Sequence, residues 1–485
     1  MRQLSQSLAA NLAVLDKMFG TSADYYAKEI TIYHCRGSIL LFDGMASLDS
    51  LWELLLDAAS RQAPPQQAGQ RCTGPQVFEL ILHGSAFPAE SEPVTDLADL
   101  VKRMTAGMAV LLLDGCAKGI AFSVQGLKFR SVDEPSGEGN LRGSREGFAD
   151  LLRVNLSLLR RLIRTEHLVQ EVAQADTEMQ TEYAICYCKN RADSAMVIRV
   201  RKALAAAKPE LLLDSSYFVP WLLPGKARLF TPVSYTERPA VAAAKICEGK
   251  IVVLVNGSPS AMVLPALFYE NFECLDDYAS TAVFSSFLRI LKYVSFYLTV
   301  FLPGVFVCLA VYLPELIPPQ LLYKIEAAEK ATPLPLFAEM LLVILILEVI
   351  REAGLRMPQS LGHSVSLVAA LILGDAAIAT GLMSTPVIFV ASITSIAVFV
   401  TPSLYEVATV LRLVVLLAAG LAGPVGLAAC ALGVLFGLTR VSALGVPYLR
   451  DVIFPEVPLS PDGVTRRSYP KLSRQPFTIW QKRGG

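Results

Sequence analysis

The pattern of hydrophobic and polar residues changes partway along the chain. Up to about residue 290, short apolar runs alternate with polar residues, as in a water-soluble domain. From Tyr293 to Arg440, long apolar stretches dominate and charged residues are sparse. Stretches of this length are typical of helices that cross a bilayer. We therefore predict a soluble part followed by a membrane part, and a function that couples the two.

The soluble part is predicted to have an α/β fold with short strands. Strands are indicated by apolar runs that end at turn residues; these runs are Ile30–Tyr33, Ser38–Phe42, Phe78–Leu82, Val110–Leu113 and Ile120–Val124. Helical periodicity lies between them, at Ser50–Ser60 and Leu97–Met104. A second set of elements follows, with helices at Arg145–Arg164 and Asp193–Ala207 and strands at Tyr183–Tyr187, Ile251–Val255 and Ala261–Leu264.

A short motif occurs once in each set. Ala109–Gly115 is followed by Ile120–Val124, and Ile251–Gly257 is followed by Ala261–Leu264. Both consist of an apolar strand, a turn opened by Asp-Gly or Asn-Gly, and a second strand. We predict two related α/β subdomains, residues 1–140 and 141–285, with internal duplication as one explanation. A helical transmembrane domain, residues 286–440, and a basic cytoplasmic tail, residues 441–485, complete the predicted organisation.

The helix predicted at Arg145–Arg164 is amphipathic, with Ser144 as its expected N-cap. Its apolar side chains are expected to face the core, and its arginines are expected to face outward; these are Arg153, Arg160, Arg161 and Arg164. The arginines either contact lipid headgroups or an acidic partner, or they form an ordinary solvated face.

Four stretches of the second half are predicted to cross the bilayer. Tyr293–Leu313 and Leu413–Leu438 are long enough at about 1.5 Å per residue. Val365–Leu382 and Val387–Leu404 are shorter but sufficient. Four crossings return the tail to the side of the soluble part. The tail is rich in lysine and arginine, which is typical of the cytoplasmic side, so both termini are predicted to be cytoplasmic.

Leu336–Ile350 is predicted to be a short helix that does not fully cross. It carries Glu339 and Glu348 and runs directly into Arg351 and Glu352. Because charge at the centre of a bilayer is costly, this segment is expected to be interfacial, re-entrant or packed inward. These four residues are the candidate polar or gating groups within the membrane.

Val365–Leu382 has one face of small side chains, which allows two interpretations. Small residues at helical spacing usually permit close helix packing. Alternatively, this face lines the pore of an oligomer, with His363 or Asp375 contacting ions. The candidate pore-lining residues are His363, Ser366, Ala370, Leu373, Gly374, Asp375 and Ala377.

Composition narrows the possible functions. The mean hydropathy of +0.47 and the 18% of charged residues fit an integral membrane protein. The nine cysteines have no metal-ligand spacing, and neither a nucleotide-binding loop nor a catalytic serine motif is present. The four histidines are scattered. We therefore predict no enzyme activity, no cofactor, no metal and no nucleic-acid partner.

Several segments in the same order resemble the GerA family of spore germination proteins. They are Leu141–Phe148 continuing through Leu158–Arg164, Tyr235–Pro239 with Glu248-Gly249, Arg351–Gly354, and Gly445–Tyr448. The matching motif residues are Arg142, Gly143, Arg145, Glu146 and Gly147, then Tyr235, Glu237, Arg238 and Pro239. Ser144 departs from the usual proline, and His363 and Asp375 stand where glutamine is expected.

The resemblance implies a multi-pass protein of the spore inner membrane, with a cytoplasmic domain of two α/β subdomains. It also implies a homo-oligomer, with a pentamer expected, that conducts monovalent cations early in germination. The expected partners are membrane lipid and either a transporter-like B subunit with a lipoprotein C subunit or a small membrane protein. Ser258–Ser260 and Thr401–Ser403 are closer to the SpoVAF branch than to the receptor A subunits, and both branches stay open.

Two other functions remain compatible with the residues. A non-conducting scaffold would use the membrane part as an anchor and the α/β subdomains to bind partners. A secondary transporter would bind its substrate at broken helices, and Pro303-Gly304 and Gly423-Pro424 offer such breaks, although no membrane repeat is visible.

Overall fold

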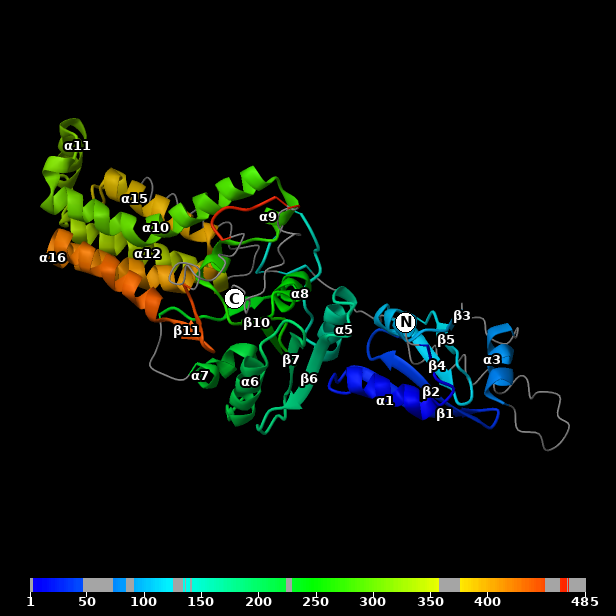
Figure 1. Cartoon of the computed structure of the whole chain (residues 1–485). Coiled ribbons are helices and arrows are strands. Elements are labelled where there is room, and N and C mark those ends of the chain that lie inside the picture. The colour runs from blue at the N-terminus through cyan, green and yellow to red at the C-terminus, as the bar shows by residue number, and fades with distance from the viewer. Residues whose placement is uncertain are drawn as a thin grey trace, which may run out of the picture.

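The computed structural model describes residues 3–46, 73–83, 91–124, 134–135, 137–139, 142–223, 229–356, 376–449, 463–468 and 470. Two sheet-containing modules lie in a row, followed by a bundle of helices (Figure 1). We call them module 1, module 2 and the helical domain. The break in the sequence pattern therefore corresponds to the boundary between the sheets and the helices.

Module 1 is an antiparallel sheet between helices. Its strand order is β1-β2-β4-β5-β3. Successive side chains along the strands alternate between two buried clusters, one against α3 and the other against α1 and α4. The elements are α1 (Leu8–Phe19), β1 (Tyr25–Ile32), β2 (Cys35–Phe42), α3 (Gly74–His83), β3 (Ser91–Val94), α4 (Leu97–Thr105), β4 (Ala109–Leu113) and β5 (Gly119–Phe122).

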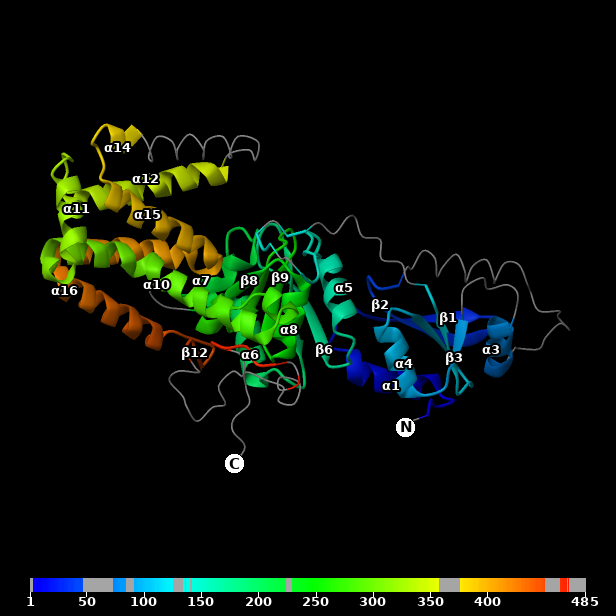
Figure 2. The ribbon, with the colours of Figure 1, turned by 90° about the horizontal axis from the view of Figure 1, so that it is seen from above.

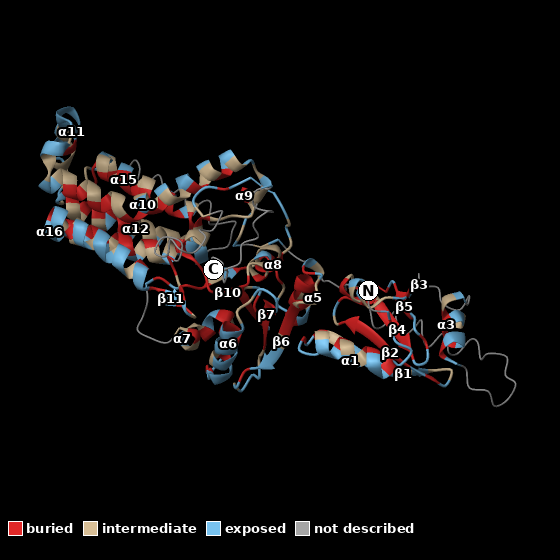
Figure 3. Cartoon of the chain, in the orientation of Figure 1, coloured by how far each residue is buried: buried red, intermediate tan, exposed pale blue. Residues whose placement is uncertain are grey.

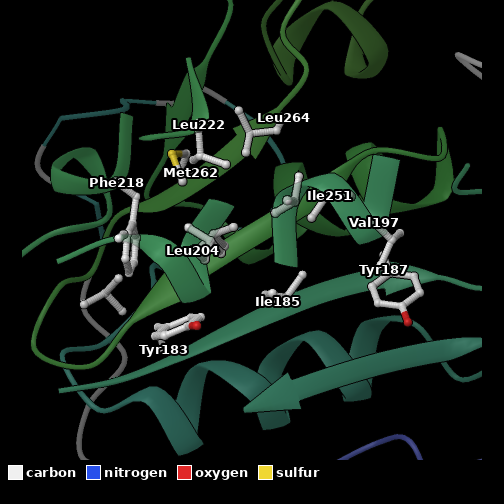
Figure 4. Close-up of a cluster of buried hydrophobic side chains, with 14 of the residues drawn as sticks. Tyr183, Ile185, Tyr187, Val197, Leu204, Phe218, Leu222, Ile251, Met262 and Leu264 are labelled. Carbon is white, nitrogen blue, oxygen red and sulfur yellow. The ribbon is translucent and has the colours of Figure 1, made fainter. Parts of the chain in front are cut away.

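Module 2 repeats this arrangement with the strand order β6-β7-β9-β10-β8. One face of its sheet packs against α6 and α7 around Phe218 and Met262 (Figure 4), and the other packs against α5 and α8. The elements are α5 (Leu152–Leu162), β6 (Leu168–Gln174), β7 (Glu182–Cys188), α6 (Ser194–Ala206), the 3-10 helix η1 (Ser215–Phe218), α7 (Val219–Leu222), β8 (Ser234–Thr236), α8 (Pro239–Cys247), β9 (Ile251–Val255) and β10 (Ala261–Leu264).

The similarity of the modules extends to side-chain hydrogen bonds. In α1, Asn11 accepts from the backbone N–H of Ser5 and donates to its carbonyl. In α5, Asn155 makes the same pair of bonds to Ala149. The turn residue Asp114 accepts from the backbone N–H at the start of α1, and Asn256 does so at the start of α5. The same set of side-chain hydrogen bonds therefore stabilises the start of the first helix in each module.

Two secondary-structure predictions for the soluble part are wrong. Phe78–Leu82 lies in helix α3, because Val77, Phe78 and Ile81 have the spacing of one helical face. The helix expected from Arg145 begins at Leu152, with Leu151 rather than Ser144 as its N-cap. Residues 144–149 belong to no helix or strand, and the backbone N–H of Phe148 donates to the carbonyl of Glu237.

The helical domain contains two helices long and apolar enough to cross a membrane, among the residues described. They are Ala282–Tyr312, which is α10, and Pro402–Arg440, which contains α16. The elements are the 3-10 helix η2 (Phe268–Phe272), α9 (Asp276–Ala279), α10 (Ala282–Tyr312), α11 (Pro319–Glu329), α12 (Leu336–Arg356), α14 (Ala377–Ala379), α15 (Thr385–Ala397), α16 (Tyr405–Arg440), β11 (Ser442–Ala443) and β12 (Val446–Pro447).

Helix α16 is two arms that fold back on each other at Gly423. The φ of 56° and ψ of −136° at this residue are not helical. A Cβ atom on Gly426 would lie 2.1 Å from the carbonyl oxygen of Ala418, so the chain reverses tightly here. Side chains of both arms share one cluster, and the second arm returns to module 2 (Figure 2), with much of its surface exposed (Figure 3).

The predicted spans need correction. Leu413–Leu438 is not one straight span, because Gly423 interrupts it. Val387–Leu404 is also interrupted, since α15 has 13 residues and non-helical Thr401 follows a short 3-10 turn. Helix α12 has 21 residues and is longer than predicted. The first 11 residues of Val365–Leu382 lie outside the described part.

Candidate functional site

The two family-like motifs of the soluble part lie together. Arg238 is buried and donates through Nη1 to the carbonyl of Ser144 at 2.7 Å and through Nε to that of Glu138 at 3.0 Å. Glu237 accepts from the backbone N–H of Gly137. These bonds hold the segment before α5 against the start of α8, where Pro239 is the first helical residue.

The remaining motif residues connect this segment to its surroundings. The backbone N–H of Arg142 donates to Asp276 of α9, and Gly143 has a φ of 108°. Glu146 pairs with Arg161, and Arg145 lies 4.0 Å from Glu134. Tyr235 lies in β8 and Gly147 in the segment before α5. The motif residues therefore hold the segment before α5 in place and connect module 2 to the first residues of the helical domain.

Arg160 corrects the expectation that the arginines of α5 face outward. Its side chain is 0% exposed, and its guanidinium binds both carboxylate oxygens of Asp24 in module 1, at 2.6 and 2.9 Å. It also lies over the ring of Phe42, 4.5 Å from the centroid. Arg153 is exposed and contacts Asp43 of module 1. The arginine face of α5 thus forms much of the contact between the modules.

The segment from Phe268 to Glu273 joins module 2 to the helical domain. Phe272 stacks on Tyr293 of α10, with centroids 3.8 Å apart. The side-chain amide of Asn271 donates to the hydroxyl of Tyr448, beside β12. The backbone carbonyl of Asn271 accepts from the hydroxyl of Ser403, just before α16. One short segment therefore contacts α10 about three turns after its start, the residues just before α16 and the chain after α16.

A buried network of charged side chains surrounds this segment. Lys245 of α8 lies 2.9 Å from Glu270 and 3.2 Å from Glu273, and Lys250 also pairs with Glu270. On the other side, Arg289 of α10 lies 3.8 Å from Glu273. Arg289 and Lys292 both approach Asp277 of α9. The network, which we call the junction network, thus runs from α8 across Glu270 and Glu273 to α10.

The two central glutamates have opposite pKa shifts. Burial raises the pKa of Glu273 to about 7, and the negative charges of Glu270 and Glu248 raise it further. The positive charges of Lys245 and Arg289 act in the opposite direction but do not cancel this increase. The pKa of Glu270 is lowered to about 2, since Lys245 and Lys250 outweigh its burial. Glu273 is therefore the member of the junction network that changes charge near neutral pH.

We expect the stability of the junction to fall as the pH rises from about 4.5 to 7. In this window the folded protein binds more protons at Glu273 than the unfolded protein, because the folded pKa is the higher one. The change in the free energy of unfolding is about 3 kcal/mol at most. Glu273→Gln should flatten this dependence, measured as the thermal unfolding midpoint in detergent at pH 5 and pH 8. An unchanged slope, equal to that of the control Glu326→Gln at an exposed glutamate outside the junction network, would contradict it.

A second group of charges lies inside the helical domain. Glu348 of α12 accepts from the hydroxyl of Tyr405 at 2.5 Å and from the guanidinium of Arg412, both of α16. Arg351 lies 3.5 Å from Glu348 and stacks on the ring of Tyr405. Arg412 is 1% exposed, while Glu348 and Arg351 are 22% and 21% exposed. We call these four residues the helical-domain charge cluster.

Glu339 is buried in the first turn of α12, as the inward-packed prediction requires. One carboxylate oxygen accepts from the backbone N–H of Ser384, the N-cap of α15. The positive end of the α15 dipole favours a carboxylate here. Glu352, by contrast, is exposed and pairs with Arg356. Glu339 and Glu348 therefore contact other helices, whereas the ion pair described for Glu352 stays within α12.

Most of the predicted pore residues lie outside the described residues. They are His363, Ser366, Ala370, Leu373, Gly374 and Asp375. Ala377 is described, and it is buried with Val387 and Ala391 of α15. The assignment of these residues to a pore stays a prediction.

Sequence reasoning missed the junction network and the role of Arg412. Glu270, Glu273 and Asp277 are close in sequence just before the first long apolar helix, and this acidic cluster was the available signal. Arg412 is a lone basic residue in a long apolar stretch, which marks a position that requires a partner.

Comparison with known proteins shows the family. The Bacillus/Clostridium GerA spore germination protein family matches residues 13–478. The chain belongs to the GerA family. It is 30% identical over 466 residues to spore germination protein KA of Bacillus subtilis, covering 95% of this chain and 84% of the relative. It is 28% identical over 439 residues to stage V sporulation protein AF of the same organism, covering 90% and 87%.

A solved structure is also similar to part of this GerA family member. It is the N-terminal domain of the A subunit of the Bacillus megaterium spore germinant receptor GerK3, with 24% identity and a TM-score of 0.44. The match covers 55% of this chain and 97% of that chain.

Proposed function

We propose that this chain is a membrane subunit of a spore germination complex that forms a homo-oligomeric channel for monovalent cations. A pentamer is the assembly we expect, in the spore inner membrane, with the B and C subunits of a receptor or a small membrane protein as partners. The observation that carries the proposal is the helical-domain charge cluster. Ionisable side chains inside a membrane domain face other helices or a water-filled path, and they mark sites of function.

The arrangement of the chain supports a cytoplasmic position for both termini. Residues 441–449 follow α16 and pack on module 2, and Arg199 of α6 donates to the carbonyl of Leu444 at 2.9 Å. The end of the helical domain therefore returns to the side of the modules. Through the junction network, a movement of module 2 would then displace α10, because Glu273 contacts both Lys245 of α8 and Arg289 of α10.

A non-conducting scaffold is the alternative. It is favoured by the pairing within the helical-domain charge cluster, since Glu348 is occupied by Arg412, Arg351 and Tyr405. In this case the helices anchor the complex and the modules bind the partner subunits.

Cation flux through liposomes that contain the purified chain separates the two functions. Wild type is compared with Ala370→Trp, which places a bulky plug on the proposed pore face, and with Ala428→Trp on the exposed part of the second α16 arm. We expect flux from wild type and Ala428→Trp and none from Ala370→Trp, all at the same oligomeric state. Equal flux from all three would contradict the pore assignment. No wild-type flux, even with the partner subunits added, would support the scaffold.

A further inference from the structure

Module 2 exposes large apolar side chains where a soluble domain would present polar ones. Their exposed fractions lie between 41% and 51%, and the residues are Leu211, Leu213, Tyr217, Leu229 and Tyr235. They belong to the segment from the end of α6 to η1, to the chain before β8, and to β8 itself. We call this set the module 2 apolar patch.

The patch lies at the end of module 2 that meets the helical domain. Leu229 directly precedes Phe230, which is buried in one cluster with Leu404 and Val441, the residues on either side of α16. Phe230 also contacts the ring of Tyr448, with centroids 6.4 Å apart. Helix α7, which follows Tyr217, lies at this same end of the module in both views (Figures 1 and 2).

The other members are tied to the same place by electrostatics. Tyr235 lies in β8, the edge strand of the sheet, where it pairs with Met262 of β10. Partial burial raises its pKa, and the carboxylates of Asp214 and Glu406 raise it further. Asp214 directly follows Leu213, and Glu406 is in the first turn of α16. Leu229 and Tyr235 therefore lie near the ends of α16.

A helical domain that spans a bilayer places the membrane surface at these ends. The outer face of the first α16 arm is already apolar there, with Val410 and Val414 each 48% exposed. Leu229, next to buried Phe230, brings the patch close to this end of α16. Tyrosine and leucine side chains are typical of segments that lie at the boundary between headgroups and acyl chains.

We propose that the module 2 apolar patch inserts into the headgroup–acyl boundary of the membrane and fixes module 2 against the bilayer surface. The proposal rests on the membrane-spanning helical domain of the proposed function, and it is independent of conduction. Lipid rather than a second copy of the chain is the occupant, because Leu229 lies beside the ends of α16, where the exposed side chains of the first arm are also apolar. Module 2 would then move relative to α10 only by sliding along the membrane.

The test uses a photo-crosslinking amino acid at Leu213 or Leu229 in the full chain, reconstituted in nanodiscs of phosphatidylethanolamine and phosphatidylglycerol. The control position is Tyr26 of β1, an exposed aromatic residue on module 1. We expect lipid adducts at Leu213 and Leu229 at several times the yield at Tyr26, measured by mass spectrometry. Using both positions guards against the failure of one variant to fold.

Three results would overturn the proposal. Lipid adducts at or below the level of Tyr26 would show that the patch does not touch the bilayer. Dominant adducts to a second copy of the chain would show that it is a subunit interface. A chain that fails to enter nanodiscs would contradict the premise that the helical domain spans a bilayer. Absence of ion flux alone would count against the proposed channel and leave lipid adducts at the patch as support for this inference.

Discussion

Glu348→Leu is expected to destabilise the helical domain by about 3–5 kcal/mol and to prevent assembly. The substitution leaves Arg412, which is 1% exposed, as an unpaired charge among apolar helices. It also removes the acceptor for the hydroxyl of Tyr405. The free energy of unfolding in mixed detergent micelles, together with the oligomeric state by size-exclusion chromatography, measures both effects.

Two variants decide whether the effect is due to the buried charge. Glu352→Leu removes a carboxylate from the same helix, but Glu352 is exposed and pairs only with Arg356 among the ion pairs described, so we expect a change below about 1 kcal/mol. The double variant Glu348→Leu/Arg412→Leu should recover much of the lost stability, because it removes both charges. A double variant as unstable as Glu348→Leu would contradict this explanation.

The charge cluster also constrains how the proposed channel would open. Glu348 joins α12 to α16, while the junction network joins module 2 to α10. A displacement of α10 by the modules reaches α12 through packing, since Val307 of α10 and Met340 and Val343 of α12 share one buried cluster. Two charged contacts separated by an apolar interface form a continuous physical route between the modules and the helices before the proposed pore segment.

The sequence pattern predicted the fully buried strands of the soluble part correctly, but it did not separate every short apolar helix from a strand. The runs Ile251–Val255 and Ala261–Leu264 coincide with β9 and β10, because both strands are buried on both faces and are apolar throughout. Phe78–Leu82, which is apolar except for Glu79, is helical, and short apolar runs do not distinguish a strand from a helix. The repeated Asp-Gly and Asn-Gly turns did indicate the related modules, whose strand orders match.

Long-range partners account for most of what the sequence could not predict. Arg160 lies at a polar position of an amphipathic helix, so the sequence predicts that it is exposed. It is buried because module 1 packs against α5 at this point. Similarly, the break at Gly423 is visible as Gly-Pro in the sequence, but the reversal depends on the contact between Ala418 and Gly426. The segment of Glu339 was expected to be interfacial, re-entrant or packed inward, because charge is costly in an apolar segment, and Glu339 is in fact buried.

Arg160→Met is expected to loosen the contact between the two modules by about 3–5 kcal/mol. The variant leaves the carboxylate of Asp24, itself 5% exposed, buried without its bidentate partner. It also removes the donor to the carbonyls of Thr165 and Leu168. Hydrogen exchange of the intact chain in detergent measures the effect locally, because the backbone N–H of Ala23 donates to Gln170 across this contact. We expect faster exchange at residues 22–25 and 168–171.

Arg153→Met is the matched control for this experiment. Arg153 lies on the same helix and also reaches an aspartate of module 1, since its Nη1 is 3.1 Å from Asp43, but its side chain is 76% exposed. A solvent-exposed pair contributes about 0–1 kcal/mol, so exchange at the contact should change little. Equal acceleration in both variants would mean that burial of Arg160 is not what holds the modules together. Asp24→Leu combined with Arg160→Met should exchange more slowly than Arg160→Met alone, because no charge is then left buried.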